Sequence, residues 1–410
     1  MSKDSSTKET QFIPVLPIIV QKKHMKKTVT YYLVSLFFHN ITKVLPHAVL
    51  TALLLQKGMN LSQISLIQSS YMLATFIFEV PSGIISDVVS EKTTYILSII
   101  TMLIAYLIIP HTDSLYILVL AWFIYGLSSA FMSGSLDTYF IKDMNQDKHD
   151  IKKFNIGVNY VLITSSILGS LTGLALFPYI GLKIYYLSLL FLPISLYFAV
   201  HINYDKKNIG SRNDSLLFTK ILPHIREMCK LINNKPVIKI VYLVIVFQIM
   251  VLAYYQYWQV IFLDRGYSTK ITGIVYIVIQ LFSIISNKIF SIINIKNNAQ
   301  KNILLLVMTI SFYLYLNTSI GIVFFFLFQI FFNIYNHNLT VILYSSVTET
   351  YLSTFISAIG VMISLFSFIF LFSISIIIKH IDTNIILTIS TFTVLFLSYF
   401  ISPYKVTNNE

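Results

Sequence analysis

The chain reads Phe78-Glu79-Val80-Pro81-Ser82-Gly83-Ile84-Ile85-Ser86-Asp87-Val88-Val89-Ser90-Glu91-Lys92 at the point where a long apolar run ends. Gly83 allows a neighbouring helix to approach closely, because it carries no bulky side chain. Asp87 stands at the C-terminal, negative end of its expected helix, where a carboxylate is unfavourable and needs a positive partner. This stretch therefore predicts a turn between two membrane helices in which Asp87 makes a specific contact.

Composition places the chain in the membrane. Of its 410 residues 56% are hydrophobic and 11% are charged, and the mean hydropathy is +0.75. That is more apolar surface than a soluble fold can bury. The single cysteine, Cys229, excludes an internal disulfide, and the sequence has no metal-spaced set of His, Cys and Glu, no phosphate-binding glycine loop and no nucleophile elbow. We expect an integral membrane protein that is not an enzyme and holds neither a metal nor a cofactor.

A helix needs about 20 mostly apolar residues to cross a bilayer, and the chain contains twelve such stretches. They run over 30–54, 62–86, 93–110, 115–140, 156–178, 181–202, 237–262, 271–293, 302–317, 319–343, 353–378 and 383–401. The predicted fold is therefore all-α, with twelve transmembrane helices in two six-helix bundles, 30–202 and 237–401. The polar linker 203–236 lies between them. Apolar residues recur in it at helical spacing among basic ones, which predicts an amphipathic helix on the inner membrane surface.

Lysine and arginine residues predict the orientation, because such residues in short loops are retained in the cytoplasm. If the tails 1–29 and 402–410 lie inside, 23 of the 29 basic residues fall in inner segments and five in outer loops, while Lys43 lies within the first span. We expect a multi-pass protein of the cell membrane with both termini in the cytoplasm. The net charge of +12 follows from this distribution, so the lipid bilayer and not a nucleic acid is the expected partner.

The stretch at 83–92 resembles the loop between the second and third helices of the major facilitator superfamily. Its pattern there is roughly Gly, three residues, Asp, Arg, one residue, Gly, Arg, Lys. Gly83, Asp87 and Lys92 match, and the remaining positions are occupied by Val88, Ser90 and Glu91. The resemblance implies that this gating motif closes the inner side by an attraction between Asp87 and the start of the eleventh helix. Because the arginine is missing, either this closure is weaker than in the family or Lys92 replaces the arginine.

The part of the fourth span from Gly126 to Tyr139 resembles the Gly/Ser/Ala-rich fourth helix of drug exporters in this superfamily. Together with the motif around Glu79 it favours the multidrug-exporter branch. In the fifth span, Gly169-Ser170-Leu171-Thr172-Gly173 stands where antiporters of that branch carry a Gly-Pro motif, without the proline. The resemblance implies a secondary transporter, with a monomer favoured, that rocks around a central cavity and binds a small-molecule substrate and protons.

Ionisable residues inside spans are functional candidates, because a charge near the bilayer centre costs roughly 2.5–3.5 kcal/mol. His39, Lys43 and His47 are spaced by four residues and share one helical face, which we expect to line a cavity. Glu79 is the predicted proton-coupling acid, paired with Lys43 or His39; the alternative is a pair that only holds helices together. Asp137 is the second acid, with a role in gating or in proton transfer.

The spans of the second half carry amides in place of acids. Amide and aromatic side chains can form the second wall of a substrate site. The cavity candidates are His47, Gln256, Gln280, Asn333 and His337. His337 also fits a simple hydrogen-bonded contact between helices.

Three functions follow from these features, of which the sequence favours proton-coupled efflux of a small amphiphilic compound or drug. Uptake of a nutrient or anion by the same fold is an alternative, because His39, Lys43 and His47 suit an anionic ligand. A lipid-linked sugar flippase or polymerase is an alternative of a different class. The motif at 83–92 and the two sets of six spans argue against that third function.

Overall fold

Long apolar stretches become helices here because a lipid environment leaves backbone groups no other donors and acceptors than their own. The computed structural model describes residues 15–133, 136–143, 148–203, 235–293, 295, 297–318, 320–346 and 352–401. The first half contains α1 (Val15–His47), α2 (Leu50–Gln56), α3 (Leu61–Val88), α4 (Glu91–Ile108), η1 (Ile109–His111), α5 (Leu115–Met132), α6 (Leu136–Asp143), α7 (Lys148–Ile180), η2 (Gly181–Lys183) and α8 (Ile184–Val200). The second contains α10 (Lys235–Asp264), α11 (Thr269–Ile292), α12 (Asn298–Asn317), α13 (Gly321–Ser345), α14 (Leu352–Ile377) and α15 (Thr383–Phe400).

All described elements are helices, and many are long enough to cross a membrane. Within the described ranges nine helical runs meet that length and apolarity, or ten if the bent pair of α1 and α2 is one span. One of these runs, Lys153–Val200, contains both α7 and α8, and α11 has a shorter apolar stretch, Ile274–Phe290. The all-helical membrane fold is thus confirmed, and the exact count of twelve spans stays a prediction.

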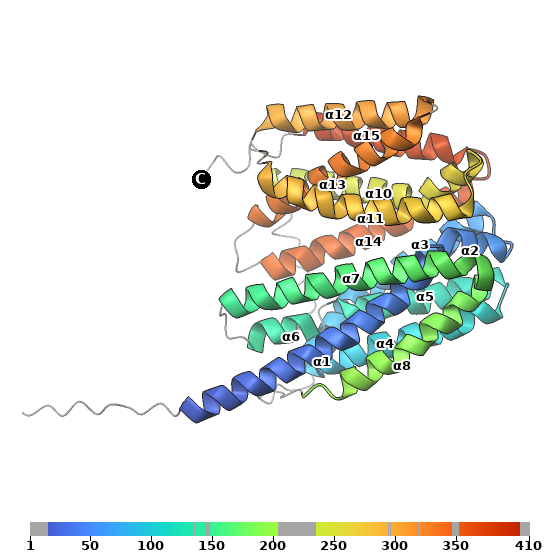
Figure 1. The fold of residues 1–410 in the computed structure, drawn as a ribbon. Coiled ribbons are helices and arrows are strands. Elements are labelled where there is room, and N and C mark those ends of the chain that lie inside the picture. Colours follow the sequence, from blue (N-terminus) through green and yellow to red (C-terminus); the bar gives the residue numbers. More distant parts are fainter. Residues whose placement is uncertain are drawn as a thin grey trace, which may run out of the picture.

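Three hydrophobic clusters hold the helices together. The first lies between Tyr32 and Ile202 and the second between Val237 and Leu395, and a small third cluster joins Tyr257, Ile374 and Ile386. Figure 1 shows α1–α8 below and α10–α15 above, with α14 packed against α3 and α11 against α7 where the halves meet. The linker and its amphipathic helix lie at 204–234, outside the described residues. We call the end at which α1 begins the inner end, after the predicted orientation; α2 lies at the outer end (Figure 1).

The first span is bent near its outer end. α1 ends at His47, α2 begins at Leu50, and the two axes differ by 53°. Pro46 lies in the last turn of α1, where its ring removes a backbone donor and disturbs the preceding turn. The bend leaves the carbonyl of Ala48 available to a donor from another helix.

The fourth span is divided, which corrects the prediction of one continuous helix over 115–140. α5 ends at Met132, and Ser133 follows in an extended conformation (φ −67°, ψ 129°). α6 starts at Leu136. Serine and glycine are weak helix formers and favour helix ends, so the sequence Ser133-Gly134-Ser135 explains the break. Asp137 therefore belongs to a separate short helix.

Two glycines permit close helix crossings in the first half. A Cβ added to Gly126 of α5 would collide with the backbone carbonyl of Tyr71 on α3, and one on Gly173 of α7 would collide with that of Leu45 on α1. The helices at these crossings touch backbone to backbone. Gly83 differs from expectation: a Cβ there would meet nothing within 4 Å, so it does not mediate a close contact in this conformation.

Gly173→Ala is expected to destabilise the protein by about 1–3 kcal/mol, the usual cost of overpacking. Gly157→Ala on the same helix is the matched control, because its Cβ would make only an ordinary contact of 3.5 Å with Leu33. In a thermal unfolding experiment Gly173→Ala should lower the midpoint, while Gly157→Ala should leave it unchanged or raise it through helix propensity. Equal midpoints for both variants would contradict the crossing described above.

Candidate functional site: the acids, amides and closures of the two halves

Glu79 meets the break in the fourth span. It lies two turns before the end of α3 and is half-buried. The hydroxyl of Ser133, the residue that caps the C-terminus of α5, lies 2.7 Å from Glu79 Oε1. The same hydroxyl oxygen lies 3.1 Å from the carbonyl oxygen of Ala130. This predicted coupling acid therefore lies beside the C-terminal end of α5, where backbone carbonyls are left without intrahelical partners.

Asp137 has a different environment. It lies in the first turn of α6 and accepts a hydrogen bond of 2.8 Å from the hydroxyl of Tyr32 on α1. Tyr32 is fully buried, and its ring packs edge-on against that of Tyr95 on α4. Asp137 thus fastens the short helix to the first span near the inner end.

The three basic residues of α1 do not share one environment, although they share a helical face. His39 is 5% exposed in the bundle core, where its ring lies 6.2 Å from that of Tyr95 and its Nε2 has no hydrogen-bond partner. Lys43 is half-buried, and His47 is exposed beside the ring of Tyr125. Lys43 and His47 thus reach the surface of the bundle and His39 is a core residue, while the cavity lined by this face stays a prediction.

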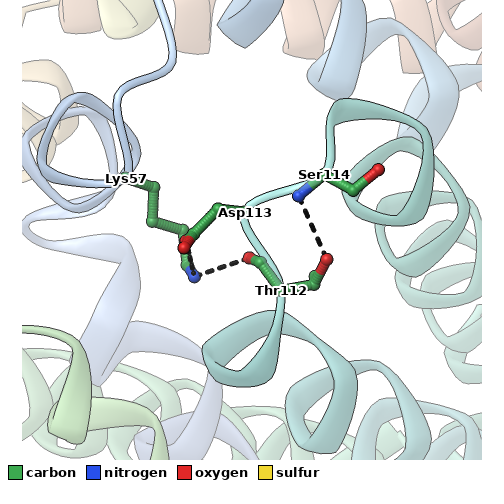
Figure 2. Close-up of polar contacts among 4 residues, drawn as sticks. All are labelled: Lys57, Thr112, Asp113 and Ser114. Atoms are coloured by element: carbon green, nitrogen blue, oxygen red, sulfur yellow. Dashed lines mark hydrogen bonds and ion pairs between the residues drawn. The ribbon is translucent and has the colours of Figure 1, made fainter.

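The predicted pair between Glu79 and Lys43 or His39 is not formed in this conformation. Among the described residues the one ion pair joins Lys57, at the end of α2, to Asp113, with 3.1 Å between Nζ and Oδ1. Figure 2 shows that Lys57 also donates to the backbone carbonyl of Thr112. The Lys57 side chain is 1% exposed and that of Asp113 79%, so this pair ties the outer turn before α3 to the turn before α5.

Lys92 of the predicted gating motif performs a different task from the one expected. Its Nζ donates to the carbonyls of Val200 (2.6 Å) and Ile202 (2.9 Å) at the end of α8. It therefore neutralises the negative end of that helix and does not replace the missing arginine in this conformation. The side chains of Asp87 and of 351–354 lie outside the described residues, so the contact of Asp87 with the eleventh helix stays a prediction.

Lys301 repeats this arrangement in the second half and was not singled out from the sequence. Its Nζ donates to the carbonyls of Ser398 (2.7 Å) and Ile401 (2.9 Å) at the end of α15. Both lysines follow a helix-capping residue, Ser90 before α4 and Asn297 before α12. This repeated cap is the sequence signal that could have identified Lys301.

Lys301→Met is expected to lower the thermal unfolding midpoint more than Lys92→Met. Methionine keeps an apolar stem but leaves carbonyls at the helix end without their donor, and hydrogen bonds to charged groups contribute about 1.5–3 kcal/mol. Lys301 is 1% exposed, whereas Lys92 is only partly buried, so water replaces the donor less well at Lys301. Lys183→Met on the exposed turn η2 is the control, and the opposite order of midpoints would contradict this interpretation.

The second half presents a neutral, amide-rich wall on α10 and α13. Gln248 Nε2 lies 3.4 Å from Asn336 Oδ1, and Gln329 Nε2 lies 3.5 Å from the hydroxyl of Tyr255. Tyr255 is 42% exposed. The predicted candidates Gln256 and Asn333 are buried on these two helices, Gln280 is half-buried on α11, and His337 lies beside the ring of Phe290. Gln248 and Gln329 belong to the amides that the sequence places in these spans, and Gln329 is fully buried.

Among the described residues, three hydrogen bonds join the halves at the outer end, and we call them the outer closure. Ser65 of α3 and Tyr257 of α10 share a bond of 2.7 Å between hydroxyls. Ser62 donates to the carbonyl of Ser375 on α14. Gln259 Nε2 donates over 3.0 Å to the carbonyl of Ala48, the group that the bend in the first span leaves available. These contacts hold the outer ends of the halves together in this conformation.

Comparison with known proteins places these features in context. A family model described as Major Facilitator Superfamily matches residues 12–371. The chain is 30% identical over 233 residues to an uncharacterised MFS-type transporter, YxaM, of Bacillus subtilis (strain 168). That match covers 54% of this chain and 56% of the relative, so the chain spans about half the length of the curated relative it matches.

Solved transporters share the architecture at low sequence identity. The nucleoside transporter NupG has a TM-score of 0.65 at 14% identity, covering 94% of this chain and 100% of that chain. The POT family transporter PepTSo has a TM-score of 0.65 at 12% identity, with coverage of 92% and 96%. A D-xylose-proton symporter has a TM-score of 0.64 at 13% identity, with coverage of 92% and 98%. Such identities indicate a common fold, and none of these relatives supports the multidrug-exporter branch.

Proposed function

The chain belongs to the major facilitator superfamily, and on that premise we propose that it is a proton-coupled secondary transporter of a small, uncharged amphiphile. It is a membrane transporter and not an enzyme. In the proposed cycle the two halves rock about the amide-rich wall of α10 and α13, and the outer closure forms and breaks once in each cycle.

One observation carries the proton coupling: Glu79 is a half-buried acid whose described partner is the hydroxyl of Ser133. A carboxyl group inside a membrane protein is costly to keep charged, and such acids mark proton pathways. A hydroxyl can bond to the protonated and to the ionised form. Glu79 is therefore suited to take up and release a proton between the halves. One structural neighbour is a D-xylose-proton symporter, which is consistent with this coupling.

The substrate class follows from the wall of the second half. The described polar groups of this wall include amides and the hydroxyl of Tyr255, a residue that is 42% exposed. Neutral donors and acceptors suit an uncharged solute with several hydrogen-bonding groups, and the tyrosine ring suits an apolar or aromatic face. Export is the direction favoured by the resemblance to drug exporters. Uptake is the second candidate, favoured by the likeness to a nucleoside transporter and a xylose-proton symporter.

A counterflow experiment tests the substrate class. Vesicles containing the purified protein are loaded with one unlabelled solute from a panel of nucleosides, sugars, dipeptides and amphiphilic cations, and entry of the labelled form is measured without an ion gradient. A neutral amphiphile or nucleoside should give a transient overshoot, which Gln329→Leu should reduce. Overshoot with charged solutes alone would contradict the proposed substrate class, and no overshoot with any neutral solute would do the same.

A further inference from the structure

Three oxygen atoms converge at the break of the fourth span, and the hydroxyl of Ser133 is the hydrogen-bond donor to the other two. Ser133 Oγ lies 2.7 Å from the carboxylate oxygen of Glu79 and 3.1 Å from the carbonyl oxygen of Ala130. A hydroxyl has a single hydrogen to donate, so it satisfies one of these acceptors at a time. The other is left without a donor from this group.

The charge at this place is uncompensated as well. Ser133 caps the C-terminus of α5, and its backbone amide bonds to the carbonyl of Ser129. A helix C-terminus carries the equivalent of about −0.5 charge, so an ionised Glu79 lies against a negative helix end. Across the described part of the chain, no basic side chain forms an ion pair with Glu79.

Asp137 provides a contrast a few residues away. It lies in the first turn of α6, and a helix N-terminus favours a carboxylate. It also receives a hydrogen bond from the hydroxyl of Tyr32. Of these two acids, only Glu79 is placed where a bound positive charge is needed to stabilise its ionised form.

We propose that Glu79, Ser133 and the carbonyl end of α5 form a sodium-binding site, at which Na⁺ competes with the proton. Carboxylate, hydroxyl and carbonyl oxygens are the ligands that hard cations take. The C-terminal ends of interrupted membrane helices coordinate Na⁺ in other secondary transporters. This inference rests on the proposed role of Glu79 as the coupling acid. Binding of Na⁺ requires the ionised carboxylate, so the carboxyl proton is released to water when the ion enters.

Thermal unfolding of the purified full chain tests the sodium-binding site without requiring transport. NaCl is titrated against choline chloride at constant ionic strength, at alkaline and at mildly acidic pH. Na⁺ should raise the midpoint, because a ligand that binds only the folded protein stabilises it, and the rise should shrink at acidic pH, where protons compete. The apparent Na⁺ affinity should fall about tenfold in Ser133→Ala and vanish in Glu79→Gln. Asp137→Asn, which removes the other acid, should keep the wild-type response.

The proposed sodium-binding site would be contradicted by equal midpoints in Na⁺ and choline for the wild type, or by an equal effect of K⁺. An unchanged Na⁺ response in Glu79→Gln, or a loss of that response in Asp137→Asn, would also contradict it. Glu79→Asp guards against a folding defect, because it keeps the charge and should bind Na⁺ more weakly than the wild type. Failure of the transport proposal is read separately. Na⁺ stabilisation without proton-driven transport would support the sodium-binding site and refute the proposed proton coupling. Proton-driven transport without Na⁺ stabilisation would support the coupling and refute the sodium-binding site.

Discussion

Glu79→Gln should abolish the accumulation of solute driven by a pH gradient while sparing exchange of solute down its own gradient. Glutamine has the size of glutamate and can still accept the hydrogen bond from Ser133, so the local packing is preserved. It neither binds nor releases a proton, so the step that couples the two fluxes is lost. The expected loss of accumulation in reconstituted vesicles is more than about tenfold.

Asp137→Asn is the matched control for this experiment. It also removes a carboxylate near the inner end of the first half, and the hydroxyl of Tyr32 can still bond to the amide oxygen. We expect Asp137→Asn to lower the rate of transport but to keep its dependence on the pH gradient. If Glu79→Gln still transports uphill with an unchanged proton requirement, Glu79 is a structural residue and Asp137 becomes the next candidate for coupling.

The double variant Tyr257→Phe/Gln259→Leu should shift the protein towards a conformation that is open at the outer end. It removes two hydrogen bonds of the outer closure, those to Ser65 and to the carbonyl of Ala48. Two such bonds contribute about 2 kcal/mol together, which is roughly a 30-fold change in the equilibrium between the two conformations. Transport should slow, because the return to the outer-closed state becomes unfavourable.

A spin-label distance across the outer end measures this shift directly. Ser114→Cys and His380→Cys, in a Cys229→Ser background, place one label on an exposed outer residue of each half. The distance distribution should lengthen in the double variant. Ser286→Ala is the control, since it removes a buried hydroxyl that bonds only within its own helix, to the carbonyl of Phe282. Identical distributions in the double variant and its parent would show that the outer closure does not set the equilibrium.

The positions of many helices follow from sequence, because apolar length and polar caps both mark them. The predicted spans 62–86 and 383–401 correspond to α3 and α15, which begin after the caps Asn60 and Asp382. The interruptions were less accessible. Pro46 and Ser133 interrupt stretches that remain apolar on average, so hydropathy predicts one helix where the chain bends or breaks.

The partners of the candidate residues were harder to predict than the residues themselves. The sequence identified Glu79 and Asp137, but their hydroxyl donors, Ser133 and Tyr32, lie 54 and 105 positions away. The predicted pairing of Glu79 with Lys43 is not formed, because the sequence does not show how each helix is rotated about its own axis. The role of Lys92 at the end of α8 likewise depends on which helices are neighbours, and a single sequence does not contain that information.

Accumulation of a counterflow-positive solute in wild-type vesicles under an imposed pH gradient tests the central proposal of proton-coupled transport most directly. The gradient is applied in both senses, with no sodium present and the membrane potential clamped. The solute should rise above its external concentration for one sense of the gradient only, and that sense distinguishes export from uptake. A protonophore should return the internal concentration to the external value. Equal internal and external concentrations under both gradients, with counterflow intact, would show a facilitator without proton coupling and contradict the proposal.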